Sequence, residues 1–378
     1  MKRTFTEILS LVLVCIMAAF SFSSCAKKYD VIYYVDDKGN IASGFNENML
    51  SFHMSMEKTA LLVQMGFNED APELWNMSLK EYGELLGFEV VDSLANTTFG
   101  QYNDQASIDI AKNMIAAEYL YDTMKNEDTV AGKLLSSADK KLEAQVDNTV
   151  SQLQLAIGSK EQFESFISGF GITLEDFRKY YEMSYKATEL RKALDVSEEE
   201  KKEYFANNYA IVKHILINTN SKTNDMGEKI SLSEQEKLEK LNEVKKIEAR
   251  LSSGEEFEAV YAEYDGQDPG TAYYTDGYFV TDNNMFMPEF QDAALDMNDG
   301  EVRTVYTSYG AHIMKKYPMD AEKYNLYSDV ESEITTVLTN AEYTKLLAPY
   351  VQKIEVNSEI AAKYSMATVP MMDPTTVQ

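Results

Sequence analysis

A change of hydrophobic pattern in the middle of the chain is the feature that most constrains its fold. The periodicity is helical as far as about Tyr209, changes over residues 210–318 to a strand, a helix, short helices and two more strands, and is helical again from Tyr327 to Lys353. This order predicts an α+β protein in which a small mixed domain interrupts a mostly helical one. A strand pair in "VIYYVDDKGNI" precedes the first helical part, and "IEVNSEI" predicts one more strand after the last.

Capping signals mark where several helices begin. A hydroxyl residue stands three positions before a carboxyl or amide side chain at four places, which are Ser159, Thr173, Ser197 and Ser233. A hydroxyl at the N-cap accepts a hydrogen bond from the N–H three residues on, while the side chain there can reach back. We therefore predict a helix after each of them, and Gly254 marks the end of the last.

The first 24 residues have the pattern of a secretory signal peptide. Lys2 and Arg3 precede an apolar run over residues 8–22 that is too short to span a membrane, and small residues then lead to Cys25. The ending "FSSC" resembles the lipobox of bacterial lipoproteins, whose cysteine is acylated after cleavage. An ordinary secreted protein that is cut near the same place is the alternative.

Cysteine content and charge narrow the classes of function. If Cys15 is removed with the signal peptide and Cys25 carries lipid, neither of the 2 cysteines is left for a disulfide, and stability has to come from packed cores. The formal net charge of the whole chain is −27, which argues against nucleic acid as a partner.

Two of the 3 histidines lie at the two ends of the central segment. His214 stands in "AIVKHILINT" and His312 in "TVYTSYGAHIMKKY", both of which read as strands, whereas His53 lies in a helical stretch. Strand alternation places His214 on the same face as Val212, and His312 on the same face as Met314. A single buried histidine is more often a hydrogen-bonded core residue than a catalytic one, and the sequence alone leaves both interpretations open.

The order of motifs around these histidines resembles the parvulin family of peptidyl-prolyl isomerases. The motifs are "VKHILI", "LSSGEEFEAVYAEYDGQDPG" and "FMPEFQDAALDMNDGEVRTVYTSYGAHI", and the resemblance covers residues 211–317. It implies a small antiparallel sheet surrounded by helices, and catalysis of cis/trans isomerisation before proline without a cofactor or a metal. The sequence also contains no cysteine cluster, no H-E-x-x-H and no phosphate-binding loop.

The resemblance assigns site residues by position. It places the paired catalytic histidines at His214 and His312, the acidic position at Asp268, and a polar residue near the last strand at Thr307. Asp268 is displaced by one residue from the usual spacing, and "YYTDGYF" replaces the usual "GG-x-LG". Four aromatic residues are assigned to substrate binding, with the first as the wall of the proline pocket: Phe290, Phe286, Tyr278 and Tyr309.

The whole chain resembles the PrsA and SurA class of extracytoplasmic foldases. A lipobox, a helical N-terminal region, an inserted parvulin domain and a closing helix occur in this order. The resemblance implies a signal peptide over residues 1–24, a helical chaperone domain over 25–209, a parvulin domain over 210–318 and a helix completing the chaperone domain over 319–366. The tail over 367–378, which carries Pro370 and Pro374, is predicted to be disordered.

This class implies an isomerase and chaperone that is lipid-anchored at the outer face of the cell membrane. Its partners would be unfolded or newly exported polypeptides that contain proline, and the resemblance also allows a homodimer. The loop "NTNSKTNDMGEK" carries Lys222 and Lys229 but no arginine, which argues against phosphorylated substrates. A non-catalytic holdase with a silent parvulin domain remains the alternative. A solute-binding lipoprotein is disfavoured, since most of the chain has no alternating strand and helix pattern.

Overall fold

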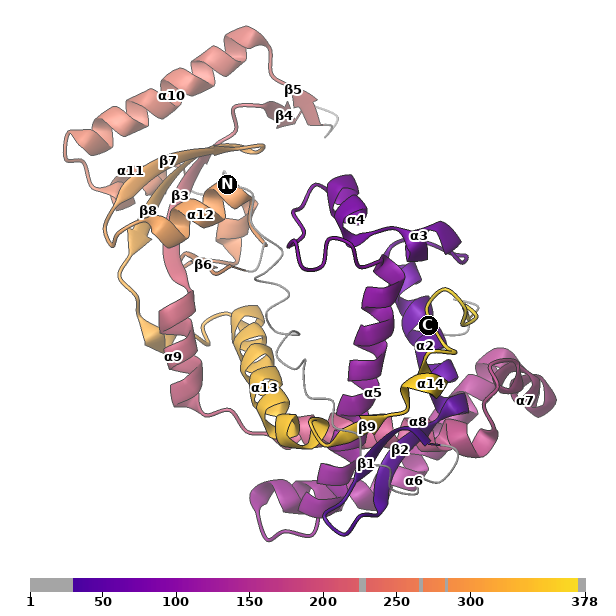
Figure 1. Cartoon of the computed structure of the whole chain (residues 1–378). Helices are drawn as coiled ribbons and strands as arrows, with labels where there is room; N and C mark the ends of the chain where they lie inside the picture. The colour runs from indigo at the N-terminus through magenta and orange to yellow at the C-terminus, as the bar shows by residue number, and fades with distance from the viewer. Residues whose placement is uncertain (1–29, 224–228, 265–267, 283–284, 373–378) are drawn as a thin grey trace. The chain divides into compact units, whose positions relative to one another are not determined.

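The computed structural model of the chain describes residues 30–223, 229–264, 268–282 and 285–372 (Figure 1). The predicted signal peptide and the lipidation site at Cys25 lie outside the described residues. The fold is α+β, as predicted from the sequence. Within the described part of the chain, no helix is both long enough and apolar enough to cross a membrane.

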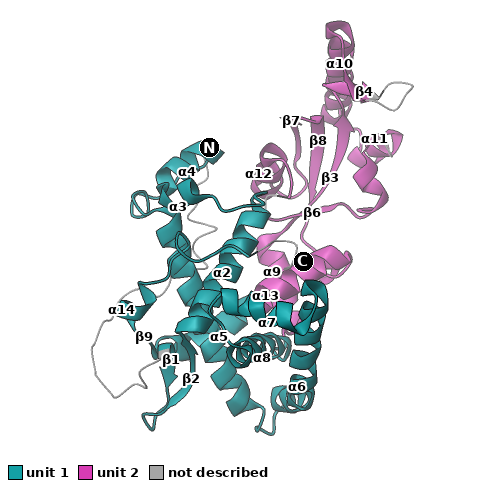
Figure 2. Ribbon diagram, turned by 90° about the vertical axis from the view of Figure 1, so that its right-hand side faces the viewer, with its two compact units in different colours: residues 1–195, 340–378 teal, residues 196–339 magenta. Residues whose placement is uncertain are grey.

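The chain divides into two compact units, which Figure 2 shows in different colours. Unit 1 comprises residues 1–195 and 340–378, and unit 2 comprises residues 196–339. These boundaries differ from those of the sequence analysis, which began the inserted domain at residue 210 and ended it at 318. The helix before the insert and the first half of the helix after it belong to unit 2, because their apolar faces pack on its sheet.

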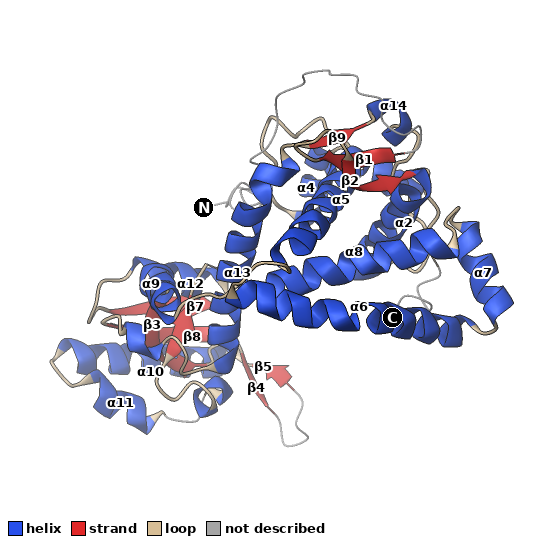
Figure 3. Ribbon diagram, turned by 90° about the horizontal axis from the view of Figure 1, so that it is seen from below, coloured by secondary structure: helices blue, strands red, loops and turns tan. Residues whose placement is uncertain are grey.

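Unit 1 combines a three-stranded antiparallel sheet with helices (Figure 3). The sheet has the order β2-β1-β9, so strands from both ends of the chain pair directly. Both predicted strand regions are thus confirmed. The elements of unit 1 are β1 (Asp30–Val35), β2 (Ile41–Asn46), α2 (Glu47–Gln64), α3 (Pro72–Asn76), α4 (Leu79–Leu86), α5 (Phe99–Met124), α6 (Val130–Ile157), α7 (Lys160–Gly169), α8 (Leu174–Lys192), β9 (Ile354–Val356), α14 (Ser358–Ala361) and the second half of α13 (Ser328–Val351).

The core of unit 1 lies between the sheet and the helices. Ile32 and Phe45 of the sheet cluster with Phe52 of α2, Ile115 of α5 and Phe177 of α8, all nearly inaccessible to solvent. Burial of each such side chain contributes roughly 1.5 to 3 kcal/mol. This is how the unit is stabilised without a disulfide among its described residues.

The end of the chain differs from the predicted disordered tail. As far as Met372 the tail packs against α2: Val369 and Met372 are buried, Lys58 Nζ donates to the Val369 carbonyl at 2.9 Å, and the Met372 N–H donates to Thr59 Oγ1 at 2.8 Å. The prediction of disorder was therefore wrong for residues 367–372. The last residues of the predicted tail, 373–378, lie outside the described residues.

Unit 2 has a four-stranded antiparallel sheet with the order β6-β3-β8-β7. Its two central strands carry the two histidine motifs. The elements of unit 2 are α9 (Glu198–Asn208), β3 (Ala210–Ile217), β4 (Ser221–Thr223), β5 (Lys229–Ser231), α10 (Glu234–Ser252), α11 (Phe257–Glu263), η1 (Pro269–Ala272), β6 (Tyr278–Val280), α12 (Pro288–Asp296), β7 (Val302–Thr307), β8 (Gly310–Tyr317), η2 (Ala321–Lys323) and the first half of α13.

Helices cover both faces of this sheet. On one face Val212 and Met314 cluster with Phe290 and Ala294 of α12, which Figure 1 shows beside the strands. On the opposite face the strands pack against α10 and α11. The alternation predicted from the sequence is confirmed, since the side chains of Val212, His214, His312 and Met314 share the face of α12.

Helix and turn signals act as the sequence predicted. The side chains of Ser159, Thr173, Ser197 and Ser233 each accept the hydrogen bond of a backbone N–H three residues on, at the start of α7, α8, α9 and α10. Such a cap is worth about 1 kcal/mol. Gly310 closes the tight turn between β7 and β8 at a φ of 139°, where a Cβ atom would lie 2.3 Å from a backbone oxygen, so only glycine fits.

Candidate active site

The two strand histidines meet on neighbouring strands of the sheet in unit 2. His214 of β3 stands opposite Met314 of β8, and His312 of β8 stands opposite Leu216 of β3, so the histidines are diagonal neighbours on one face. Their Nδ1 atoms are 3.1 Å apart, and both side chains are buried. The antiparallel register thus brings together two residues that lie 98 positions apart.

A continuous series of hydrogen bonds runs through this pair. His214 Nε2 lies 2.8 Å from Asp268 Oδ2, and His312 Nε2 lies 2.8 Å from Thr307 Oγ1. The backbone N–H of Tyr309 donates to Thr307 Oγ1 at 3.0 Å. All four residues that the parvulin resemblance assigned to catalysis are therefore in contact.

The direction of these hydrogen bonds follows from the acid. A carboxylate can only accept, so His214 donates through Nε2, and a neutral imidazole that donates at one ring nitrogen accepts at the other. His312 must then donate through Nδ1 and accept through Nε2 from the hydroxyl of Thr307. In this arrangement every proton of the series has one donor and one acceptor.

The position of Asp268 is fixed by residues around it. Asp268 caps η1, and its Oδ1 accepts from the Gly270 N–H at 3.0 Å, while Tyr278 Oη donates to Oδ2 at 2.5 Å. The unusual spacing before Asp268 therefore does not prevent its contact with His214. A Cβ atom on Gly270 would lie 2.0 Å from Tyr278 Oη, so this glycine is needed for the close approach.

The surroundings keep the acid charged and His312 neutral. Burial alone would raise the pKa of Asp268, but the hydrogen bonds from His214, Tyr278 and the Gly270 N–H together hold it well below its usual range. Burial lowers the pKa of His312 to about 4, and the nearby His214 adds to this effect while Asp268 opposes it. Burial also raises the pKa of Tyr278 above its usual range, as does its bond to the acid. At neutral pH, Asp268 is thus ionised and His312 is uncharged.

Aromatic rings lie directly against the histidines. The Phe290 ring meets His214 edge to face at a centroid distance of 5.0 Å and His312 at 5.2 Å. Phe286 stacks on Phe290 at 5.6 Å, and Tyr278 lies 5.9 Å from Phe286. Three of the four aromatic residues assigned to substrate binding therefore form one apolar group beside the hydrogen-bond series.

Two assignments take on a different meaning in the structure. Tyr278 was assigned to substrate binding, and its hydroxyl is in addition a direct partner of Asp268. The ring of Tyr309 is 52% exposed and lies near Lys229, 5.6 Å from its Nζ, so only the backbone of Tyr309 reaches the series. Sequence reasoning missed the role of Gly270, although "DPG" is a typical turn signal that places a donor beside the acid.

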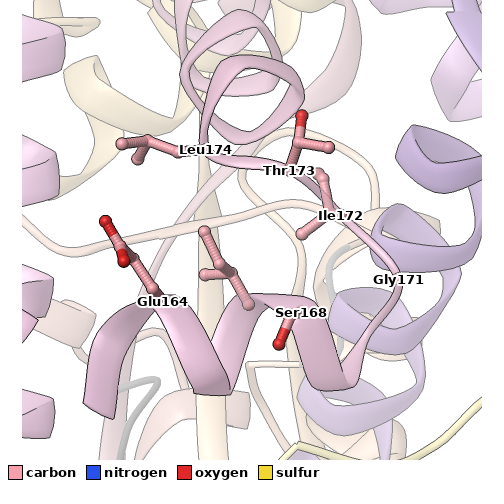
Figure 4. Close-up of a pocket in the computed structure, with 7 residues that line it drawn as sticks. Glu164, Ser168, Gly171, Ile172, Thr173 and Leu174 are labelled. Atoms are coloured by element: carbon pink, nitrogen blue, oxygen red, sulfur yellow. The ribbon is translucent and has the colours of Figure 1, made fainter. Parts of the chain in front are cut away.

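Two cavities lie away from the residues assigned to the site. A cavity of about 330 Å³ in unit 1 is lined by residues of α7 and the turn into α8, and Figure 4 shows its side chains. A second, of about 510 Å³ in unit 2, lies between the β4–β5 hairpin and α10. Neither includes a residue assigned to the site. Over the described ranges, no three His, Cys, Asp or Glu side chains are grouped so that they could hold a metal ion.

Comparison with known proteins agrees with this geometry. Residues 193–317 match the family model of the PPIC-type PPIase domain. This part of the chain is a peptidyl-prolyl isomerase domain of the parvulin type. The match begins before β3 and ends with the last residue of β8, so it includes every residue of the hydrogen-bond series.

The chain is related to PrsA foldases. It is 28% identical to the foldase protein PrsA of Staphylococcus epidermidis over 217 residues, which make up 54% of this chain and 62% of that protein. It is 25% identical to PrsA of Clostridium kluyveri over 304 residues, or 75% of this chain and 80% of that protein. The match thus spans less than two thirds of the length of the staphylococcal relative.

Solved PrsA structures are also matched. The crystal structure of PrsA from Bacillus subtilis covers 62% of this chain and 86% of that chain, with 20% identity and a TM-score of 0.23. PrsA from Bacillus cereus covers 72% of this chain and 93% of that chain, with 16% identity and a TM-score of 0.27.

Proposed function

We propose that this protein is a peptidyl-prolyl cis/trans isomerase and chaperone for exported polypeptides, held at the outer face of the cell membrane by a lipid on Cys25. The observation that carries the proposal is the series Asp268, His214, His312 and Thr307 beneath the ring of Phe290. This series joins a buried histidine pair to a carboxylate that is 17% exposed, which a purely apolar core does not require. The domain type and the PrsA relatives support the same activity.

The reaction needs a change of environment and no covalent step. Rotation about the bond before proline has a barrier of roughly 18 to 20 kcal/mol, because conjugation keeps the amide planar. In the twisted transition state this conjugation is lost, and the carbonyl oxygen carries less negative charge than in the planar form. A site lowers the barrier if it binds the twisted form more tightly than the planar one.

The residues of the site can supply this preference. In our proposal the proline ring packs against Phe290 and Phe286, which remove water from the amide. The ionised Asp268 disfavours the planar resonance form, in which the carbonyl oxygen is negative. His214 and His312 hold Asp268 and Thr307 in fixed positions and do not act as nucleophiles.

An isomerisation assay tests the activity. The chain without residues 1–25 is mixed with short unphosphorylated peptides that contain proline, and exchange between cis and trans is followed with and without it. We expect catalysis that is lost in His214→Ala. Cooperative unfolding shows that the assayed wild-type chain is folded. If that folded chain did not catalyse the exchange, the isomerase part of the proposal would be rejected.

Membrane anchoring is tested at Cys25. A diacylated cysteine adds roughly 0.8 kcal/mol of membrane affinity for each buried CH₂ group, which is sufficient for stable attachment. We expect Cys25→Ser to move the protein from the membrane fraction to the soluble fraction of the exporting cell. A variant that stays in the membrane fraction after a salt wash would show that the lipobox interpretation is wrong.

The exposed apolar residues of unit 1 favour a second candidate, a holdase without turnover. Five large aliphatic side chains on its helices are more than half exposed, and they are Leu85, Leu86, Val130, Leu134 and Leu155. Exposed apolar side chains can contact unfolded segments, and these five lie on two helices, α4 and α6. Isomerisation and client-aggregation assays on the wild-type chain and on His214→Ala separate the two candidates. The holdase would be favoured if the wild-type chain had no isomerase activity and the variant still suppressed client aggregation.

A further inference from the structure

The segment that carries Asp268 is held from two sides within unit 2. We define the Asp268 loop as residues 268–277, between α11 and β6. On the side of the sheet, Tyr278 holds Asp268 itself, and Gly277 lies so close to β3 that a Cβ atom would be 2.8 Å from the Val212 carbonyl oxygen. The other side of the loop is held by residues that follow the sheet in sequence.

These residues lie at the start of α13 and just before it. Tyr274 Oη donates to Asp329 Oδ2 at 2.9 Å, and Tyr273 Oη lies 3.4 Å from Asp329 Oδ1. The backbone N–H of Asp276 donates to Tyr327 Oη at 2.9 Å. Tyr327 and Asp329, on either side of the first residue of α13, therefore hold three residues of the Asp268 loop, which are Tyr273, Tyr274 and Asp276.

The same contacts lead back to the acid through packed rings. The Tyr327 ring lies 5.0 Å from that of Tyr274, and the Tyr274 ring lies 4.9 Å from that of Tyr278, whose hydroxyl donates to Asp268. Tyr327 is 5% exposed and belongs to a core cluster with Phe279 of β6 and Ile334 of α13. Tyr327, which holds the Asp268 loop, is thus itself part of a packed core.

We propose that Asp329 and Tyr327 are positioning residues for the isomerase site and act through Tyr274 and Tyr278 on Asp268. The proposal rests on the proposed isomerase function for its kinetic consequence only. Both residues lie beyond residue 317, where the match to the PPIC-type domain ends. The functional unit therefore includes the start of α13, although the domain pattern in the sequence stops before it.

Asp329→Asn is the first test, because it removes one acceptor and keeps the shape of the side chain. The hydrogen bonds of Asp329 are exposed to solvent, so we expect kcat/KM for a proline peptide to fall only about threefold. Glu331→Gln is the matched control. The substitution removes the same charge from the same helix, but Glu331 faces Lys201 and not the Asp268 loop. Tyr274→Phe should cost as much as Asp329→Asn, and the double variant should cost no more than either.

A spectroscopic readout separates positioning from a merely structural role. The chain has only 3 histidines, so their side-chain ¹⁵N and proton resonances can be assigned individually. In Asp329→Asn we expect the proton on His214 Nε2 to move upfield, because its bond to Asp268 weakens. His53, which lies in unit 1, serves as the internal reference and should not move.

The two readouts also distinguish the failure of this proposal from the failure of the proposed function. If the wild-type chain had no isomerase activity, the resonance of His214 would still report on the position of Asp268. An unchanged His214 resonance in Asp329→Asn would overturn the positioning role, as would an equal shift in Glu331→Gln.

Discussion

Two buried histidine sites, one in each unit, differ in what lies at the ends of their hydrogen bonds. In unit 1, His53 Nδ1 lies 3.0 Å from Tyr180 Oη, and His53 Nε2 lies 3.0 Å from the Ser107 carbonyl oxygen. In unit 2, the pair of His214 and His312 ends at a carboxylate and at a hydroxyl. In both sites, every ring nitrogen has a partner.

The difference separates a histidine of the core from the histidines of the candidate site. His53 is completely buried among aromatic rings and bonded to neutral groups, so a ligand has nothing to reach there. The series in unit 2 instead ends at Asp268, whose side chain is 17% exposed and whose pKa is held far below its usual range. Both sites are buried and have satisfied hydrogen bonds. Only the series in unit 2 ends at a charged group that solvent can reach, which is Asp268.

Removal of unit 2 should have the largest effect. The ends of the cut belong to one apolar cluster of unit 1, in which Leu190 of α8 packs with Leu347 of α13. Joining Asp195 to Asn340 through a short Gly/Ser linker should therefore leave a soluble protein that melts cooperatively and has no isomerase activity. Circular dichroism during heating and the isomerisation assay measure the two properties.

A shorter excision sharpens this result. Joining Asn207 to Asp320, near the boundaries that the sequence predicted, keeps Phe205 and Ile334 but removes the strand residues that cover them, such as Phe279. We expect that product to aggregate. If instead the longer excision gave a molten product and the shorter one a folded protein, the division of α13 between the units would be wrong.

Within the site, His214→Ala and His312→Ala should each lower kcat/KM at least about tenfold. Each substitution breaks the series and leaves a buried partner without its hydrogen bond, a loss of roughly 1 to 3 kcal/mol. Initial rates on one unphosphorylated peptide series measure the effect. His53→Ala is the control that should keep the wild-type rate per folded molecule; equal losses in all three variants would point to general unfolding.

The four residues assigned to catalysis are in contact, whereas the compact units differ from the predicted domain boundaries, and both outcomes have physical reasons. Strand alternation places His214 on the face of Val212 and His312 on the face of Met314, but the β3–β8 register is needed to make that one face. Asp268 and Thr307 were assigned through the resemblance to parvulins. Helical periodicity in residues 328–351 shows that an apolar face exists, but it cannot show that the face packs on two different units. Such a change of partner is a tertiary property that no local pattern records.

The C-terminal tail teaches a similar lesson. Val369 and Met372 lie in a short stretch with prolines and no periodicity, and local patterns therefore predict disorder. They are ordered by contact with the distant helix α2, where Lys58 is fully buried and bonded to Asp70 at 2.6 Å. A partner more than 300 residues away in sequence is invisible to any local signal.

Substitution of His53 should affect stability and leave catalysis unchanged. His53→Ala opens a cavity and leaves Tyr180 and the Ser107 carbonyl buried without a partner, which we expect to lower the free energy of unfolding of unit 1 by about 3 kcal/mol. Trp75 is the only tryptophan, is 2% exposed and lies in unit 1, so its fluorescence during urea unfolding reports on this unit. An unchanged midpoint would contradict a core role.

Acid should weaken unit 1 through the same residue. Burial lowers the pKa of His53 to about 4, below the unfolded value of about 6.5, so the unfolded chain binds the proton more readily. The stability is fully present above pH 6.5 and is lost as the pH falls toward 4, by roughly 2 to 3 kcal/mol at pH 4.5. Urea unfolding followed by Trp75 fluorescence at pH 6.5 and at pH 4.5 measures this loss of stability.

The matched variant for this pH effect is His53→Gln. An amide can accept from Tyr180 and donate to the Ser107 carbonyl as the neutral imidazole does, but it does not titrate. The difference in stability between wild type and His53→Gln should therefore depend on pH between 6.5 and 4. Parallel curves for the two proteins would show that other groups cause the loss in acid.

The smallest effect is expected at Tyr309, the assigned residue that lies at the edge of the site. Its ring is 52% exposed, and its one contact with the hydrogen-bond series is the backbone N–H to Thr307 Oγ1, which alanine keeps. Tyr309→Ala should therefore change kcat/KM by less than about twofold, since an exposed cation–π contact with Lys229 is worth only about 0.5 to 1 kcal/mol and does not touch the series. Thr307→Val, which removes the hydroxyl between Tyr309 and His312, should lower the rate several-fold in the same assay. A large rise in KM for Tyr309→Ala would restore the substrate contact that the sequence assigned, and would extend the site from its Thr307 end onto the exposed hairpin between β7 and β8.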